Sequence, residues 1–159
     1  MRDHTPMTKV DERAVVPSVD ASANRRLAAA LDRDGVVAAS LLGSQASGKA
    51  GPLSDIDVGV WLQPGLPADD RPELRLQLAG AAVRALGTGE IDVVVLNGAP
   101  PLLRHRAMRD GERILERDRA ARVRLETRAL LEYLDTAPLR ATLAEGRRRR
   151  LAEGRFGRR

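Results

Sequence analysis

The chain has 159 residues, a formal net charge of +5 and no cysteine. This length fits one domain with a core of its own, and the lack of cysteine excludes disulfides and thiolate metal sites. No apolar run approaches membrane-spanning length and the amino terminus has no apolar signal segment, so we expect a cytoplasmic protein without membrane contacts.

The first part of the chain predicts a helix followed by a strand. Residues 1–19 are polar and lack periodicity, and we expect them to be disordered. A helix is expected to begin at Asp20 or Ser22, because either side chain can cap it, and to run through Asp32. The apolar run 36–42 then predicts a short strand that leads into a glycine-serine turn.

The middle of the chain predicts two further strands separated by a helix. Apolar runs of strand length occupy residues 55–62 and 90–96. A connector with two prolines and a glycine fills 63–67, and helical spacing of leucine and alanine follows it up to Gly87. A strand, a helix and a second strand in this order predict an α/β arrangement.

The last part of the chain is mostly helical. Residues 100–108 predict a short helix, 113–116 a brief strand and 118–135 a long helix, and a final helix is expected after Pro138. The predicted fold class is therefore α/β, with a small mixed sheet flanked by helices and a C-terminal helical extension. We expect a core over 20–117, with the helices and basic tail of 118–159 in the same domain.

Two carboxylates one residue apart follow the glycine-serine turn. Side chains alternate along a strand, so Asp55 and Asp57 point to the same face. Two charges at about 4 Å repel by roughly 4 kcal/mol at an effective dielectric near 20, unless a cation lies between them. The Ile-Asp-Val pattern recurs at Asp92, which a neighbouring strand can bring to the same corner, although Glu90 shares its face and competes for the role. Hard carboxylate oxygens suit Mg²⁺ or Mn²⁺.

The turn itself is a candidate phosphate site. A turn that opens a helix presents unpaired backbone N–H groups, and we expect Gly43 and Ser44 to bind phosphate there. Metal-binding carboxylates beside a phosphate site are typical of nucleotidyl transfer.

These motifs together resemble the signature of the DNA polymerase β-like nucleotidyltransferases, through Gly43-Ser44, Ala46, Gly48, Ser54-Asp55-Ile56-Asp57 and Asp92. The short length and residues 97–103 resemble the minimal branch of that family, the MntA-type antitoxins of HEPN/MNT toxin-antitoxin pairs. The resemblance covers roughly residues 20–156. It departs from the family at Gln45 and Ser47, where members commonly have basic residues, and Lys49 is a candidate to supply the missing charge.

The resemblance implies both a reaction and a partner. It implies a Mg²⁺-dependent (or Mn²⁺-dependent) enzyme in which Asp55, Asp57 and Asp92 bind metal and catalyse, and Gly43, Ser44, Ser54 and Lys49 bind nucleotide. ATP would be the AMP donor, and a tyrosine of a HEPN ribonuclease toxin the acceptor.

Other interpretations remain open at this point. A transferase acting on a small molecule such as an aminoglycoside would normally need an added domain to enclose its acceptor. An inactive antitoxin that acts by binding is the other alternative, because Gln45 and Ser47 depart from the family pattern. Arginine is concentrated near the carboxy terminus, from Arg147 onwards, and favours a solvated helix face or an acidic protein partner over nucleic acid, since the chain has only three aromatic residues. His4 and His105 are expected at the surface, and Trp61 over the sheet.

Overall fold

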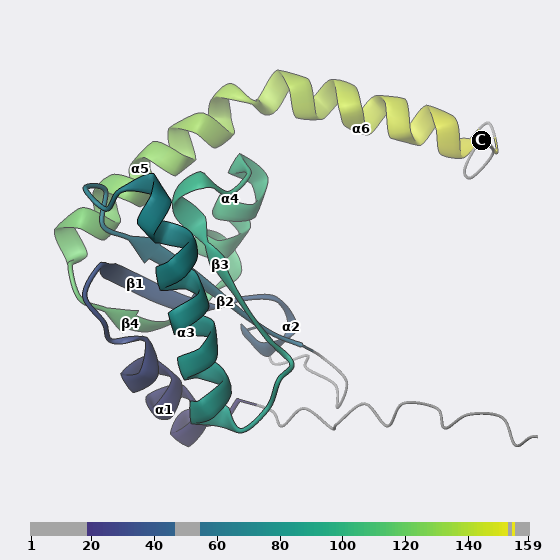
Figure 1. The fold of residues 1–159 in the computed structure, drawn as a ribbon. Coiled ribbons are helices and arrows are strands. Elements are labelled where there is room, and N and C mark those ends of the chain that lie inside the picture. The colour runs from purple at the N-terminus through teal and green to yellow at the C-terminus, as the bar shows by residue number, and fades with distance from the viewer. Residues whose placement is uncertain (1–18, 47–54, 153, 155–159) are drawn as a thin grey trace, which may run out of the picture.

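A mixed four-stranded sheet lies at the centre of the molecule (Figure 1). The computed structural model describes residues 19–46, 55–152 and 154. The strand order is β3-β2-β1-β4, and the bounds are Val36–Leu41 for β1, Ile56–Leu62 for β2, Ile91–Val95 for β3 and Glu112–Glu116 for β4. The predicted fold class, an α/β protein with a small mixed sheet, is confirmed.

The pairing of the strands follows from their connections. β1 runs antiparallel to β2 and to β4, whereas β2 and β3 run parallel. Parallel strands need a crossover, and α3 (Arg71–Leu86) supplies it between β2 and β3. The register of this parallel pair places Asp57 opposite Asp92.

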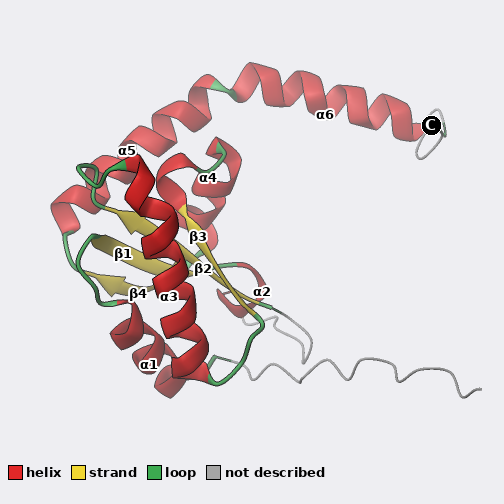
Figure 2. Ribbon diagram, in the orientation of Figure 1, coloured by secondary structure: helices red, strands yellow, loops and turns green. Residues whose placement is uncertain are grey.

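Helices cover both faces of the sheet (Figure 2). On one face, α1 (Ala21–Leu31) and α3 pack against the even-numbered residues of β2, with Leu27 and Leu78 fully buried. On the other face, α4 (Pro101–Asp110) and α5 (Arg119–Asp135) enclose a second cluster that includes Trp61. Buried apolar area of this kind is the main contribution to stability, at about 25 cal/mol per Å².

Side-chain caps account for where two of these helices begin. Asp20 accepts a hydrogen bond from the Ala23 amide at 2.7 Å, and Asp118 accepts one from the Ala121 amide at 2.8 Å. The choice between Asp20 and Ser22 is therefore resolved in favour of Asp20. Gly87 ends α3 with a positive φ of 69°, a conformation that glycine adopts without strain.

Three short helical segments connect the main elements: α2 (Gly43–Ala46) directly after β1, and the 3₁₀ turns η1 (Ala68–Asp70) and η2 (Leu96–Gly98). The helix predicted after the 63–67 connector begins at Arg71, because residues 68–70 form the 3₁₀ turn η1. The final helix, α6 (Ala137–Ala152), forms the expected C-terminal extension. Across the described residues no helix is both long and apolar enough to cross a bilayer. The disorder expected for residues 1–19 falls almost wholly outside the described residues.

Candidate functional site

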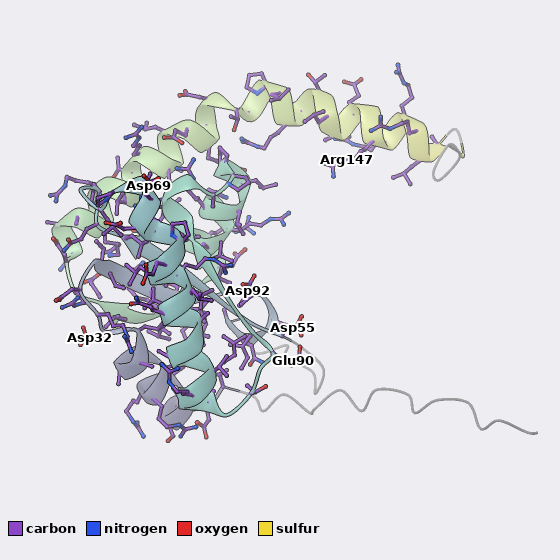
Figure 3. All side chains as sticks on the ribbon, viewed as in Figure 1. Asp32, Asp55, Asp69, Glu90, Asp92 and Arg147 are labelled. Atoms are coloured by element: carbon purple, nitrogen blue, oxygen red, sulfur yellow. The ribbon has the colours of Figure 1, made fainter. Side chains whose placement is uncertain are left out.

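The acidic residues meet where β2 and β3 begin. Asp55 lies immediately before β2 and is exposed, and Asp57 is half-buried on the face that α4 and α5 cover. Asp92 occupies the matching position of the parallel edge strand. Figure 3 shows Asp55, Glu90 and Asp92 gathered at the same end of the sheet. The structure thus places the three carboxylates that the sequence singled out at the same end of the sheet.

The electrostatics at Asp57 favour a bound cation. Partial burial raises the pKa of this carboxyl above its usual range, and the negative charges of Asp92 and Asp55 raise it further. Each neighbour therefore makes the ionised form of Asp57 more costly. A divalent cation reverses this effect, and the oxygen donors present are those that Mg²⁺ and Mn²⁺ prefer.

Asp92 already has a cationic neighbour. Arg75 reaches it around the sheet edge from α3, with Nη1 at 3.5 Å from Oδ1 of Asp92, and the same nitrogen donates a hydrogen bond to the Val93 carbonyl at 3.1 Å. Over the residues that the structure describes, no three His, Cys, Asp or Glu side chains form a group that could hold a metal ion. Asp55 and Asp57 fit a hard cation by the chemistry of their oxygen donors, whereas Asp92 contacts Arg75.

The turn after β1 is built closely against Asp57. Gly43 has a φ of +63°, and a Cβ at this position would lie 3.3 Å from Oδ2 of Asp57. Any larger residue would therefore be strained and crowd the carboxylate. The Leu42 amide donates to the Asp57 carbonyl at 2.8 Å, which fixes the turn to β2. Ser44 follows, half-buried, in the first turn of α2.

Gln45 has a structural position. Its side chain is buried, and Oε1 accepts a hydrogen bond from the Val19 amide at 3.2 Å. A basic residue there would bury a charge, so this departure from the family pattern has a packing reason. Ser47, Lys49 and Ser54 lie outside the described residues.

A cleft of about 440 Å³ adjoins Gly43 and Asp57. The carboxy-terminal part of α4 forms its other wall, and the lining residues are Leu42, Gly43, Asp57, Val94, Leu103, Arg106, Ala107, Asp110 and Gly111. Gly111 lets α4 end close to β1, since a Cβ there would collide with the Ala107 carbonyl and lie 3.1 Å from the Leu41 carbonyl. Asp57 and the glycine turn therefore open onto a space bounded by a helix.

Arg106 is the functional candidate that the sequence reasoning missed. It is the one basic side chain among the described residues that line this cleft. The neighbouring acid, Asp110, accepts two hydrogen bonds from Arg109, both at 2.6 Å, and this contact lowers the pKa of Asp110. Asp110 is thus paired with Arg109, and the charge of Arg106 lowers its pKa further. Arg106 lines the same cleft as Asp57. Nothing in the local sequence distinguished it from the other arginines of a charged helix.

Neither Trp61 nor His105 lines the cleft beside Asp57. Trp61 is 4% exposed and packs in the core beneath α4 and α5, as expected for a residue that covers the sheet. His105 was expected at the surface, and this is wrong: it is half-buried and stacks on Tyr133, with ring centroids 3.8 Å apart. The sequence could not show that α5 brings an aromatic ring against this side of α4.

Comparisons with known proteins agree with this geometry. The sequence profile "Polymerase beta, Nucleotidyltransferase" matches residues 26–120. No curated protein matches the chain.

Solved structures share the fold. A chain in the crystal structure of a toxin-antitoxin with AMP-PNP superposes with a TM-score of 0.63 at 19% identity, covering 77% of this chain and 96% of that chain. A chain in a tri-AMPylated HEPN toxin from Shewanella oneidensis in complex with MNT antitoxin gives 0.57 at 18% identity, with coverages of 77% and 94%. A chain in the toxin-antitoxin MntA-HepT gives 0.55 at 18% identity, with coverages of 78% and 95%.

Proposed function

This chain belongs to the polymerase beta nucleotidyltransferase family, and on that premise we propose that it is an antitoxin that transfers AMP from ATP to a tyrosine of a HEPN ribonuclease toxin. The observation that carries the proposal is the pairing of Asp57 with Asp92 across parallel strands, beside a cleft that also holds Gly43 and Arg106. Two carboxylates, a glycine turn and a cationic side chain are the parts that nucleotidyl transfer requires.

The acceptor is inferred from the solved relatives and from the open cleft. One relative is a toxin-antitoxin with AMP-PNP, and another holds a tri-AMPylated HEPN toxin with its MNT antitoxin. In the described part of the chain a single sheet carries the site, and no second domain closes over the cleft. An open site of this kind suits a side chain presented by another protein better than a small molecule that must be enclosed.

In the proposed reaction the acceptor hydroxyl oxygen attacks the α-phosphorus of ATP. A new oxygen–phosphorus bond forms, the α–β phosphoanhydride breaks, and pyrophosphate leaves. Asp55 and Asp57 would hold Mg²⁺, which when bound neutralises the charge that develops on the phosphoryl and pyrophosphate oxygens. Asp92 helps remove the hydroxyl proton and completes the metal site. Gly43, Ser44 and Ser54 would position the phosphates through N–H and O–H donors.

Arg106 supplies positive charge to the phosphates in this arrangement, together with Lys49. Family members commonly use basic residues in the turn for this purpose, and here Gln45 is buried in the packing of that turn. A guanidinium on the opposite wall of the cleft can contact phosphate oxygens in bidentate geometry. The phosphate-binding charge would then come from α4.

Replacing Arg106 is therefore expected to weaken nucleotide binding. Arg106→Ala should raise the Kd for Mg²⁺-ATP about tenfold, the range of one charge-assisted contact, and calorimetry measures it. Arg84→Ala is the matched control, because Arg84 is an exposed arginine near the end of α3, on the other face of the sheet. An unchanged Kd for Arg106→Ala would mean that Arg106 does not bind the nucleotide.

The function itself is tested on a purified partner. The proposal requires a HEPN partner encoded beside this chain. When that partner is incubated with this chain, ATP and Mg²⁺, intact-protein mass spectrometry is expected to show added mass in units of AMP on a tyrosine. The partner should lose ribonuclease activity at the same time. A partner that is inhibited without gaining mass would make this chain a binding antitoxin. A partner that is neither modified nor inhibited would favour the alternative function, a transferase that acts on a small molecule.

A further inference from the structure

The helix α6 carries large apolar side chains although it has no core to bury them in. None of its residues is buried, and Figure 1 shows it extending away from the sheet beyond the end of α5. Leu139, Leu143 and Leu151 are 60%, 54% and 60% exposed. The family profile ends at residue 120, so α6 lies outside the region shared by the family. Exposed leucines in such a place are typical of an interaction surface.

The three leucines share about a third of the circumference of the helix with Arg147 and Arg150, which lie between them. At about 100° per residue, Leu143 lies roughly 40° and Leu151 roughly 120° around the axis from Leu139. On α5, Leu130 and Leu134 form an i,i+4 pair that is 42% and 54% exposed. A partner helix packed along α6 would cover the three α6 leucines together.

The junction with α5 holds α6 in a defined direction. Arg140 of α6 donates hydrogen bonds to the Tyr133 carbonyl and to the Thr136 hydroxyl, and its guanidinium carbon lies 3.6 Å from the centre of the Tyr133 ring. The opposite contact of that ring is His105, stacked at an interplanar angle of 6°. His105 belongs to α4, the helix that forms one wall of the cleft. The stack therefore links the junction between α5 and α6 to α4, the helix that lines the cleft.

The charge of α6 indicates which kind of partner can bind to it. The helix contains five arginines, four of them consecutive at 147–150, and one acid, Glu145. A second copy of this chain would bring two strongly positive helices together. Nucleic acid would use the arginines, but α6 offers leucines and no aromatic ring on which a base can stack. Leucines beside arginines match a protein surface that is apolar and flanked by Asp or Glu.

We propose that the side of α6 that carries Leu139, Leu143 and Leu151 with Arg147 and Arg150 is a docking surface for an acidic amphipathic helix of the protein that this chain modifies. The identity of that partner rests on the proposed function. Docking at this distance from the cleft supplies affinity without occupying the cleft, so the acceptor tyrosine stays free to enter it.

Affinity for the HEPN partner, measured without nucleotide by calorimetry on full-length chains, tests the surface. The double variant Leu139→Ser with Leu143→Ser is expected to bind the partner at least about tenfold more weakly. The reason is that it lacks two leucines that the partner would bury in the interface. The variant should fold normally, since both side chains are solvent-exposed, and thermal unfolding checks this. Leu76→Ser is the matched control, because Leu76 is 71% exposed on α3, and it should bind as tightly as the wild type.

The outcomes separate this proposal from the proposed function. Weaker binding of the double variant supports the docking surface, whether or not the wild-type chain transfers AMP to the partner. Equal binding of wild type and double variant overturns it, even if the partner gains AMP. A leucine-dependent dimer in sedimentation would assign the surface to a second copy, and RNA oligonucleotide binding that depends on Arg147–Arg150 but not on the leucines would assign it to nucleic acid. Either result overturns the proposal.

Discussion

Asp55→Ala and Asp57→Ala are each expected to lower the rate of AMP transfer by about 10³-fold or more while leaving the protein folded. Loss of a metal-binding carboxylate removes several kcal/mol of charge stabilisation from the transition state, and each 1.4 kcal/mol is about tenfold in rate. Both variants should also bind Mg²⁺-ATP more weakly. Single-turnover transfer and calorimetry measure the two effects separately.

The stability of these variants is part of the expectation. The raised pKa of Asp57 means that its ionised form destabilises the fold at pH values above that pKa, and this cost disappears as the pH falls toward the ordinary value. Removing the charge at neutral pH in a chelator should therefore keep or raise the unfolding temperature. A variant that loses both activity and stability would point to a structural role instead.

A matched acid elsewhere provides the control. Asp69 is exposed in the 3₁₀ turn η1, and Figure 3 shows it far from Asp55 and Asp92. Asp69→Ala should transfer AMP at the wild-type rate. If Asp55→Ala and Asp57→Ala bind Mg²⁺-ATP as well as Asp69→Ala does, the metal assignment is wrong.

Much of the core was predictable because its periodicity is local. The runs at 36–42, 55–62 and 90–96 became β1, β2 and β3, with ends displaced by a residue at most. The placement of Asp92 beside Asp57 was also foreseeable, because the same Ile-Asp-Val environment recurs on two strands that a helix connects. Alternation along strands and helical spacing are properties of neighbouring residues, so the sequence alone contains them.

The parts that were missed depend on tertiary packing. Arg106 enters the site only because α4 folds back over the end of β1, and Arg75 meets Asp92 only because β3 is an edge strand around which a long side chain can reach. His105 became half-buried because Tyr133, many residues later, stacks on it. None of these contacts has a short-range signature. A single sequence lists the arginines of this chain without indicating which of them lines the cleft beside Asp57.

Asp92→Asn is expected to reduce turnover about 10²-fold or more with a smaller effect on nucleotide affinity. In the proposed reaction Asp92 would lie on the acceptor side and help to deprotonate the attacking hydroxyl. Loss of a general base commonly costs 10²–10⁴-fold. Its asparagine variant keeps the shape and removes the charge, including the charge that Arg75 now contacts at 3.5 Å. Single-turnover rates at saturating ATP, compared with the Kd for ATP, separate the two effects.

Glu90→Gln distinguishes Asp92 from its neighbour. Glu90 lies two residues earlier at the same end of the sheet, but it precedes β3 and is not part of the strand pairing that places Asp92 opposite Asp57. Its side chain is therefore expected to contribute little, and Glu90→Gln should retain most of the wild-type rate. A larger loss of turnover in Glu90→Gln than in Asp92→Asn would assign the role of general base to Glu90 instead. Equal and small losses in both variants would mean that Asp55 and Asp57 carry the reaction without a third carboxylate.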